Sequence, residues 1–336
     1  MPNPTQSDLH INAPLTNVSV AYMQEASAYV ADKVFPRVPV KKQSDVFCKY
    51  SKSDWRRTDA QKRAPGTESA GSGWKVNTDL YYAQVYAVHK DLDDQTRSNA
   101  DSNWSLDKDA TTFVTNQLLL KRDLDWNAAF FKDGVWAQDL TGVATAPTTN
   151  QFLKFSDAAS DPISLFADLQ TKFVLQAGRK ANTLVLGAHV VNAMKQHPDI
   201  IDRIKYTQKG IVTTDLLATL FDVEKVLVSY ASYTDVAEIN DAKAQDAAAT
   251  YQFMTNSTGA LLCYSPKAPS LMEPAAGYTF TWNGYLGGNS HGIRMSNFRM
   301  EHIRSDRIEG EMTYDMKVVS PDMGIFMKDA VADPSV

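Results

Sequence analysis

The chain has 336 residues, 43% of them hydrophobic and 22% charged, a composition typical of globular proteins with a substantial buried core. Its net charge of −5 argues against a protein whose main role is to grip nucleic acid, because basic domains dominate that class. No apolar run approaches the roughly 20 residues that span a bilayer, and the first residues lack the pattern of a secretory signal. Cys48 and Cys263 lie far apart in no CxxC arrangement, which predicts reduced thiols that act as small apolar side chains.

The first 90 residues predict an arm followed by a hairpin. Residues 1–37 are polar and punctuated by proline, with apolar residues at helical spacing between Val20 and Val30 that predict a short helix. Within residues 38–90, two extended arms rich in Val and Tyr flank the Gly- and Ser-rich segment APGTESAGSG. An arm of about 15 residues reaches roughly 50 Å, and such a ribbon cannot bury its own apolar side chains. We therefore expect the hairpin to lie on another surface.

A long helix is expected next, with Ser102 or Asn103 as its cap and Gly134 at its end. At about 1.5 Å per residue it would be about 40 Å long. The expected buried stripe has steps of three and four: Leu106, Ala110, Phe113, Gln117, Leu120, Leu124, Ala128 and Phe131.

The remainder of the chain predicts an α/β segment and a β-rich end. Asp161 and Pro162 open a helix, and two apolar strands, 183–187 and 225–230, are separated by helical segments. This order indicates a parallel crossover. The last hundred residues contain short strands and one regular strand, Ile308 to Val318, whose strict alternation predicts one buried face and one wet face.

The motifs that carry common chemistry are absent from the sequence. It contains no GxGxxG, GxxxxGK[ST], HExxH or GxSxG pattern. His189 and His197 lie eight residues apart near Asp199 and Asp202, but a structural metal needs a third and a fourth ligand at compatible spacing. We therefore interpret this stretch as a rigid block with histidines at helix ends. The sequence predicts no catalytic, cofactor or metal site, and a protein that is not an enzyme.

The order of these parts resembles the major capsid proteins of tailed double-stranded DNA bacteriophages. The segments that carry the resemblance are SDPISLFADLQ, NTLVLGAHVVNAMKQHPDIIDRI, TTDLLATLFDVEKVLVS, PSLMEPAAGYTFTW and IEGEMTYDMKVV. The resemblance implies the α+β fold of the Hong Kong 97 type. Its parts would be the N-arm at 1–37, the E-loop hairpin at 38–90, the spine helix and start of the P-domain at 91–160, the axial A-domain at 161–250, and the remaining A-domain and the P-domain sheet at 251–336.

The resemblance also implies a function. Hexamers and pentamers of the chain would close into an icosahedral shell that encloses the phage DNA and contacts it non-specifically, and the shell would assemble in the host bacterial cytoplasm. A portal and, in some shells, a decoration protein would be partners. Some relatives carry a cleaved scaffolding-like N-terminal extension. Because the hairpin here begins within the first forty residues, we expect a separate scaffolding protein.

Three other functions remain open on the sequence alone. An encapsulin-type nanocompartment shell has the same fold but holds cargo enzymes instead of a genome, so shell size and DNA content distinguish it. An unrelated α/β enzyme would be a monomer or a small oligomer in solution. A nucleic-acid-binding module is disfavoured by the charge, except in the hairpin.

The charge pattern suggests a contact between copies. Residues 41–63 carry a local charge of +5 (eight basic minus three acidic residues), and residues 91–109 carry −4 (two basic minus six acidic). We expect the basic arm to dock near the spine helix of a neighbouring subunit, although both segments are equally typical of solvated charged faces. The predicted contact residues are Arg56, Arg57, Lys62 and Arg63 on the arm and Asp93, Asp94 and Asp101 on the neighbour.

A covalent cross-link is a second feature that the resemblance raises. Some relatives join a hairpin lysine to a P-domain asparagine through a buried glutamate. Lys62 is the candidate donor here, with Asn289 or Asn297 as acceptor. No local pattern marks such a triad, so we expect that this shell is not cross-linked.

Overall fold

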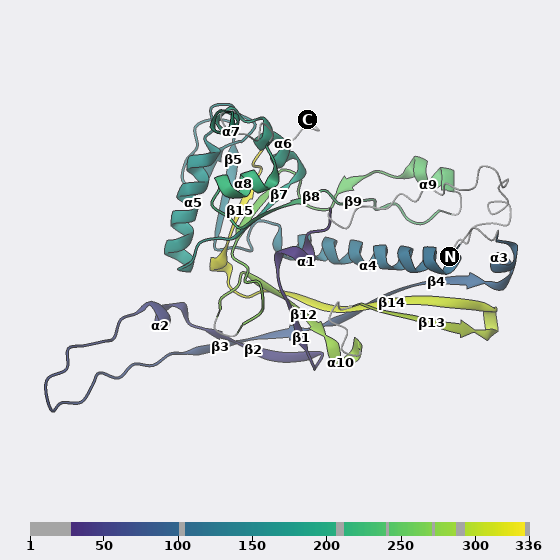
Figure 1. Ribbon diagram of the computed structural model, residues 1–336, viewed down its shortest axis with the longest axis horizontal. Helices are drawn as coiled ribbons and strands as arrows, with labels where there is room; N and C mark the ends of the chain where they lie inside the picture. The colour runs from purple at the N-terminus through teal and green to yellow at the C-terminus, as the bar shows by residue number, and fades with distance from the viewer. Residues whose placement is uncertain are drawn as a thin grey trace.

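The computed structural model describes residues 28–100, 105–205, 212–239, 242–270, 273–286 and 293–332. Figure 1 shows an elongated body built on one long helix and a sheet, a second sheet domain above it, and a hairpin that projects from one side. Most of the helix expected between Val20 and Val30 lies outside the described residues.

The elongated body contains a five-stranded sheet and the long helix α4 (Leu106–Phe130). The strand order is β1-β12-β14-β13, and β4 pairs with the other edge of β14. The strands are β1 (Arg37–Val40), β4 (Gln84–Asp93), β12 (Gly277–Trp282), β13 (Ile293–Met300) and β14 (Ser305–Val318).

The second domain is a six-stranded sheet in the order β6-β5-β15-β11-β7-β8. Its strands are β5 (Gln138–Val143), β6 (Gln151–Leu153), β7 (Thr183–Gly187), β8 (Lys225–Ser229), β11 (Ala260–Cys263) and β15 (Gly324–Lys328). The helices around this sheet are α5 (Pro162–Ala177), α6 (Ala188–Gln196), α7 (Pro198–Ile204) and α8 (Thr214–Leu220).

Short elements complete the described chain. Those of the hairpin and its surroundings are α1 (Ala31–Val34), β2 (Ser44–Tyr50), α2 (Lys52–Arg56), β3 (Val76–Tyr82) and α3 (Asp94–Asn99). Those of the second half are β9 (Ser232–Tyr233), α9 (Ala242–Ala248), β10 (Gln252–Phe253), α10 (Asn283–Leu286), and the 3-10 helices η3 (Glu301–Ile303) and η4 (Pro321–Met323).

The parallel crossover expected from the sequence is present. Strands β7 and β8 pair in parallel from Thr183 with Lys225 to Gly187 with Ser229. The sheet, however, is wider than residues 161–250, because β5 and β6 precede that range while β11 and β15 follow it. A continuation of this domain within 251–336 was expected, whereas β5 and β6 were assigned to the segment of the long helix, because strand pairing between distant segments is not visible in local sequence patterns.

The long helix is confirmed, but its buried stripe and its end were predicted wrongly. The helix ends at Phe130, four residues before Gly134. Of the predicted stripe, Ala110 and Phe131 are buried but Phe113 is 50% exposed, and the other apolar residues that α4 buries are Val114, Leu118, Trp126 and Phe130. The apolar residues wrap around much of the helix, so spacing alone did not select the face that meets the sheet.

Strand β14 packs against α4 at very close range. A Cβ atom at Gly310 would lie 2.5 Å from Val114 Cγ1 and 2.9 Å from Leu118 Cδ1, so only glycine allows this approach. The side chains of Met312 and Tyr314 are buried against the same two helix residues. The alternation predicted for this strand is therefore confirmed on the helix side.

The opposite face of β14 is not as wet as the sequence predicts. Glu311 is 9% exposed and Thr313 1% exposed. Arg294 pairs with Glu311, and Tyr285 donates a 2.7 Å hydrogen bond to the same carboxylate. Side chains of α10 and β13 thus cover a face that its own sequence marks as solvent-exposed.

The start of the described chain is anchored on α4 by a buried carboxylate. Asp123 is fully buried, and its Oδ1 accepts hydrogen bonds from the backbone N–H groups of Val30 (3.0 Å) and Ala31 (2.7 Å). Burial raises the pKa of Asp123 to about 6, although these hydrogen bonds and the neighbouring Arg122 act in the opposite direction. The other oxygen of Asp123 has no hydrogen-bond partner among the described residues.

Replacing Asp123 with asparagine should stabilise the protein at pH 7.5. Asparagine keeps an acceptor oxygen for Val30 and Ala31 but has no charge. Above pH 6 the buried charge of Asp123 destabilises the folded state by up to about 3 kcal/mol. Because the folded-state pKa is raised, the wild-type free energy of unfolding increases as pH falls from 7 towards 4. The advantage of Asp123→Asn in urea unfolding should therefore shrink between pH 7.5 and pH 5.

The matched control is Asp123→Leu, which leaves two buried N–H groups unpaired and should destabilise by about 2 kcal/mol or more at either pH. An asparagine variant less stable than wild type at pH 7.5, by a margin that does not depend on pH, would contradict the role assigned to the charge.

Candidate functional site

The hairpin is the part of the molecule that extends farthest from either sheet (Figure 1). Strands β2 and β3 pair in antiparallel register from Ser44 with Tyr82 to Tyr50 with Val76. Beyond this stem lie α2 and an exposed tip at 57–75. The paired ribbon is thus shorter than expected, because the chain after Ala83 leaves the hairpin and forms β4 against β14.

One face of the hairpin stem rests on its own chain. The ring of Tyr81 stacks on Phe280 at 4.7 Å between centroids, and Phe47 lies 5.0 Å from the same ring. The backbone N–H of Tyr82 donates to the carboxylate of Asp315. The expectation that the hairpin has no local partner is wrong for this face, because Phe280 of β12 covers its aromatic residues.

The opposite face of the stem is apolar and open to solvent. Nineteen large hydrophobic side chains are exposed among the described residues, and eight of them lie between positions 44 and 85. They are Val46, Tyr50, Trp55, Trp74, Val76, Leu80, Tyr82 and Val85. We call this set the outward face. So large an apolar patch on a projecting segment is typical of a surface that another molecule covers.

Three aromatic rings form the end of the outward face nearest the tip. Trp55 lies edge-on to Tyr50 at 6.0 Å between centroids and 6.2 Å from Trp74. The two tryptophans are 54% and 65% exposed. The sequence contains a signal for this face, since alternate positions of 44–50 and 76–82 carry its residues. The apolar hairpin arms were expected to lie on another surface, but the individual contact residues were predicted from charge and omit this face.

The basic residues at the neck of the hairpin already have partners in their own chain. Arg56 donates from Nη1 to the carbonyl oxygens of Leu175 (2.8 Å) and Gln176 (3.0 Å) at the C-terminal end of α5, where a cation is favoured. Arg57 donates from Nε to the carboxylate of Asp59 (2.7 Å), and this hydrogen bond and the negative charge of Asp59 raise the pKa of Arg57, which also pairs with Asp54. Both arginines therefore stabilise the neck of their own hairpin.

Lys62 and Arg63 lie in the exposed tip. Arg63 donates to the carbonyl of Thr67 within the tip. No ion pair to either side chain is found among the described residues, so both charges face solvent at the tip. Asn297, one of the two candidate cross-link acceptors, is exposed on β13, while Asn289 lies outside the described residues.

The predicted acidic patch is engaged within its own domain. Asp93 caps α3 by accepting from the N–H and hydroxyl of Thr96. Asp94 receives two hydrogen bonds from Arg299, and this contact lowers the pKa of its carboxyl. Asp101 lies outside the described residues.

The basic tip and the acidic patch do not meet within one chain. They lie beyond opposite ends of β4, whose ten residues span about 33 Å. A contact between them would therefore join two copies.

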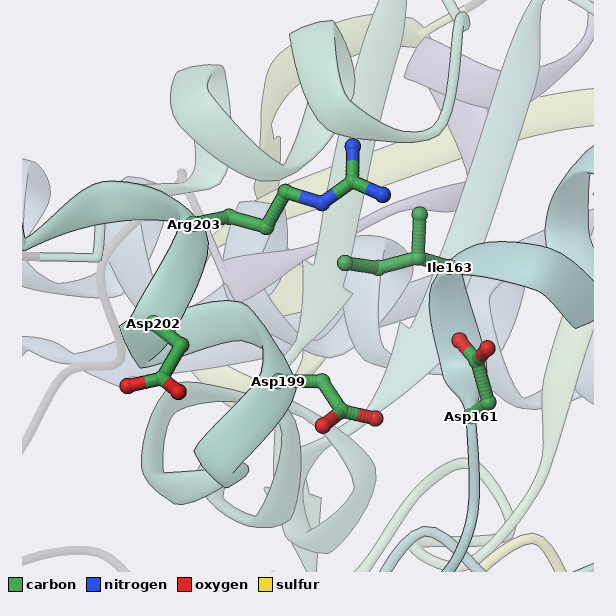
Figure 2. A pocket seen from close by; sticks show the side chains of 5 residues that line it. All are labelled: Asp161, Ile163, Asp199, Asp202 and Arg203. Carbon is green, nitrogen blue, oxygen red and sulfur yellow. The ribbon is translucent and has the colours of Figure 1, made fainter.

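Within residues 189–202, His197 and Asp202 make structural contacts. His197 is buried, lies 3.0 Å from Ser160 Oγ, and accepts at Nδ1 from the N–H of Asp199 at the start of α7. Asp199 and Asp202 line an open cavity of about 390 Å³ with Asp161 and Arg203 (Figure 2). Asp161 caps α5 there, and Asp202 pairs with Lys205.

The described residues contain no group of three or more His, Cys, Asp or Glu side chains placed to hold a metal ion. No helix in these ranges has the length and apolar character needed to cross a membrane. Burial raises the pKa of Cys263 to about 12, so that thiol is unreactive, whereas Cys48 is exposed and departs from the expectation of a buried apolar role.

Two curated relatives have similar sequences. The chain is 30% identical to the major capsid protein of Burkholderia phage BcepMu over 240 residues, which cover 68% of this chain and 72% of that protein. It is 26% identical to the major capsid protein of Pseudomonas phage JBD67 over 335 residues, which cover 96% and 97%. No protein-family model matches the sequence.

Solved structures show the same fold at low sequence identity. A phage-related protein from Bordetella bronchiseptica has a TM-score of 0.65 at 19% identity, over 91% of this chain and 94% of that one. The capsid of cyanophage P-SCSP1u has a TM-score of 0.60 at 11% identity, over 96% and 93%. The SrpI encapsulin of Synechococcus elongatus also matches, with a TM-score of 0.51 at 8% identity over 95% of each chain.

Placing a charge on the outward face should weaken self-association without unfolding the subunit. Leu80 is 55% exposed, and its burial by a second copy would contribute about 1.5–3 kcal/mol. Leu80→Asp should raise the protein concentration needed for association by about 10- to 100-fold in light scattering. Asn77→Asp adds the same charge on the other face of β3 and should leave association unchanged. Equal behaviour of the two variants would rule out the outward face as the contact.

Proposed function

The chain belongs to the major capsid proteins of bacteriophages and has their Hong Kong 97 type fold, and we propose that its hexamers and pentamers close into an icosahedral shell around the phage double-stranded DNA. The elongated body with α4 then corresponds to the spine helix and P-domain, the six-stranded sheet to the A-domain, and the hairpin to the E-loop. The observation that carries the proposal is the outward face, which projects from the body and stays uncovered in a single chain.

The encapsulin alternative has the weaker support. Encapsulins share the fold, but the likeness at 8% identity extends to the fold alone. The relatives that are similar in sequence across two thirds or more of the chain are phage capsid proteins. A genome, not a cargo enzyme, is therefore the content that we propose.

We assign the chain a structural role and no catalytic step. Its partners in this proposal are other copies of itself, a separate scaffolding protein, a portal, in some shells a decoration protein, and DNA bound non-specifically through its phosphates. Assembly would take place in the host bacterial cytoplasm, and the finished shell is that of the virion.

We also propose that charge guides the hairpin onto the neighbouring copy. Since Arg56 and Arg57 hold the neck of their own hairpin, the tip residues Lys62 and Arg63 are better placed to reach a neighbour's Asp93 and Asp94. Arg299 already neutralises part of that acidic patch. Exposed ion pairs contribute about 0–1 kcal/mol each. The charges therefore make a small contribution to the free energy of assembly, and the outward face makes the larger one.

Removing the tip tests the proposed shell. Deleting Thr58 to Gly73 should leave soluble subunits or capsomers that do not close, because the deletion shortens the segment that spans to a neighbour while β2, β3 and the sheets remain. Electron microscopy and sedimentation of purified particles provide the measurement. Normal closed particles from the deletion would refute assembly through the hairpin.

Reversing the tip charges tests the electrostatic part. Lys62→Glu with Arg63→Glu should shift the salt dependence of assembly, and Asp93→Lys with Asp94→Lys should partly restore it. Lys132→Glu with Lys267→Glu makes the same change in net charge at exposed positions away from the hairpin. If the tip variant shows the salt dependence of that control in turbidity measurements, the tip charges are bystanders.

A further inference from the structure

Two sets of exposed apolar side chains lie on opposite sides of the A-domain: α5 covers one side, and β9 leaves on the other side to lie above α4 (Figure 1). On one flank, α5 exposes Val174 and Leu175, which are 40% and 82% accessible. On the other flank, the short ribbon of β9 and β10 and the residues next to it expose Tyr230, Tyr251 and Phe253, which are 47%, 68% and 39% accessible. We call these the α5 flank and the ribbon flank.

The α5 flank is hollowed as well as apolar. Helices α5 and α8 border an open cavity of about 240 Å³. Its apolar lining is Ile163, Ala167, Val174, Leu220 and Phe221. The ribbon flank has the complementary form: Tyr251 and Phe253 are two residues apart in an extended segment, so both rings stand on one side of it.

The two flanks also differ in charge. On the α5 flank the exposed Lys172 and Lys180 are balanced by the exposed Asp168 and Asp222, whereas around β9 and α9 the exposed Asp235, Glu238 and Asp246 outnumber Lys243. Two ribbon flanks therefore repel each other, and the near-neutral α5 flank is the more favourable partner for a ribbon flank.

A ring of identical subunits joins one flank of each copy to the opposite flank of the next. We propose that the α5 flank of one A-domain binds the ribbon flank of the next copy, with Tyr251 of that copy seated in the cavity between α5 and α8. This inference rests on the proposed function, because it names the contact that closes a capsomer. The hairpin leaves the body on the side of α5, so the copy that receives the hairpin is the one whose ribbon meets α5 (Figure 1).

Paired cysteines test this contact in assembled shells. In a Cys48→Ser background, Leu175→Cys with Tyr251→Cys should be joined by a short bismaleimide linker. Denaturing gels should then show a ladder of covalent multimers up to the capsomer size. Each single cysteine variant can give no more than dimers, and the double variant dissociated into subunits should give no ladder. Shells whose double variant yields no multimers beyond those of the single variants would overturn the proposal.

A charge substitution provides an independent readout. Leu175→Asp should raise the concentration needed for assembly about tenfold or more, while Ile201→Asp, at an A-domain residue that is 44% exposed outside both flanks, should not. If the two variants assemble at the same concentration, the proposal is overturned, even when both form shells. If the wild-type protein forms no closed shells, the proposed function itself is overturned. That result is distinct from a failure of the cross-linking or of the charge substitution.

Discussion

The packing of β14 on α4 is the contact on which the rest of the structure depends. Gly310 lets the strand lie directly on Val114 and Leu118, and β4 and β13 extend the sheet from either side of this strand. The other end of the same helix places Trp126 and Phe130 in the main core of the molecule. One rigid helix therefore spans from the P-domain sheet to the A-domain core, and their relative position is fixed by close packing.

Apolar surface that this packing does not bury is concentrated on segments that project or face sideways. A stable monomer rarely exposes contiguous apolar patches of this kind, since their burial is a main source of association free energy. In a closed shell every copy offers the same patches to its neighbours, so a surface that is a liability for a monomer becomes the means of assembly. The absence of catalytic motifs in the sequence is consistent with that role.

Much of this architecture could be predicted from the sequence, because its strongest signals are local. The alternation from Ile308 to Val318, the cap at Asp161 and the Gly- and Ser-rich tip each depend on neighbouring residues alone. The wrong face of α4 and the covered face of β14 have a different origin. Which side of a helix meets the sheet, and whether Arg294 and Tyr285 cover Glu311, is decided by segments far away in the chain.

The candidate site was only partly accessible to sequence reasoning for the same reason. The charge pattern led us to predict the hairpin as a contact element, but it could not show that Arg56 is held by α5 or that Asp94 is held by Arg299. The fold decides which charged side chains lie close enough to pair, and the sequence alone does not show those spatial neighbours.

The tether between the hairpin neck and the A-domain has a mechanical consequence. Arg56 grips two carbonyl groups at the end of α5, and Lys52 pairs with Asp322 beside it. These contacts are polar and close to solvent, so each can break and reform at little cost. A shell built from hexamers and pentamers requires the same subunit to meet its neighbours at more than one angle. The aromatic contacts of Tyr81 and Phe47 with Phe280 keep the stem on the body, so release of these polar contacts frees only the neck and the tip to change their angle.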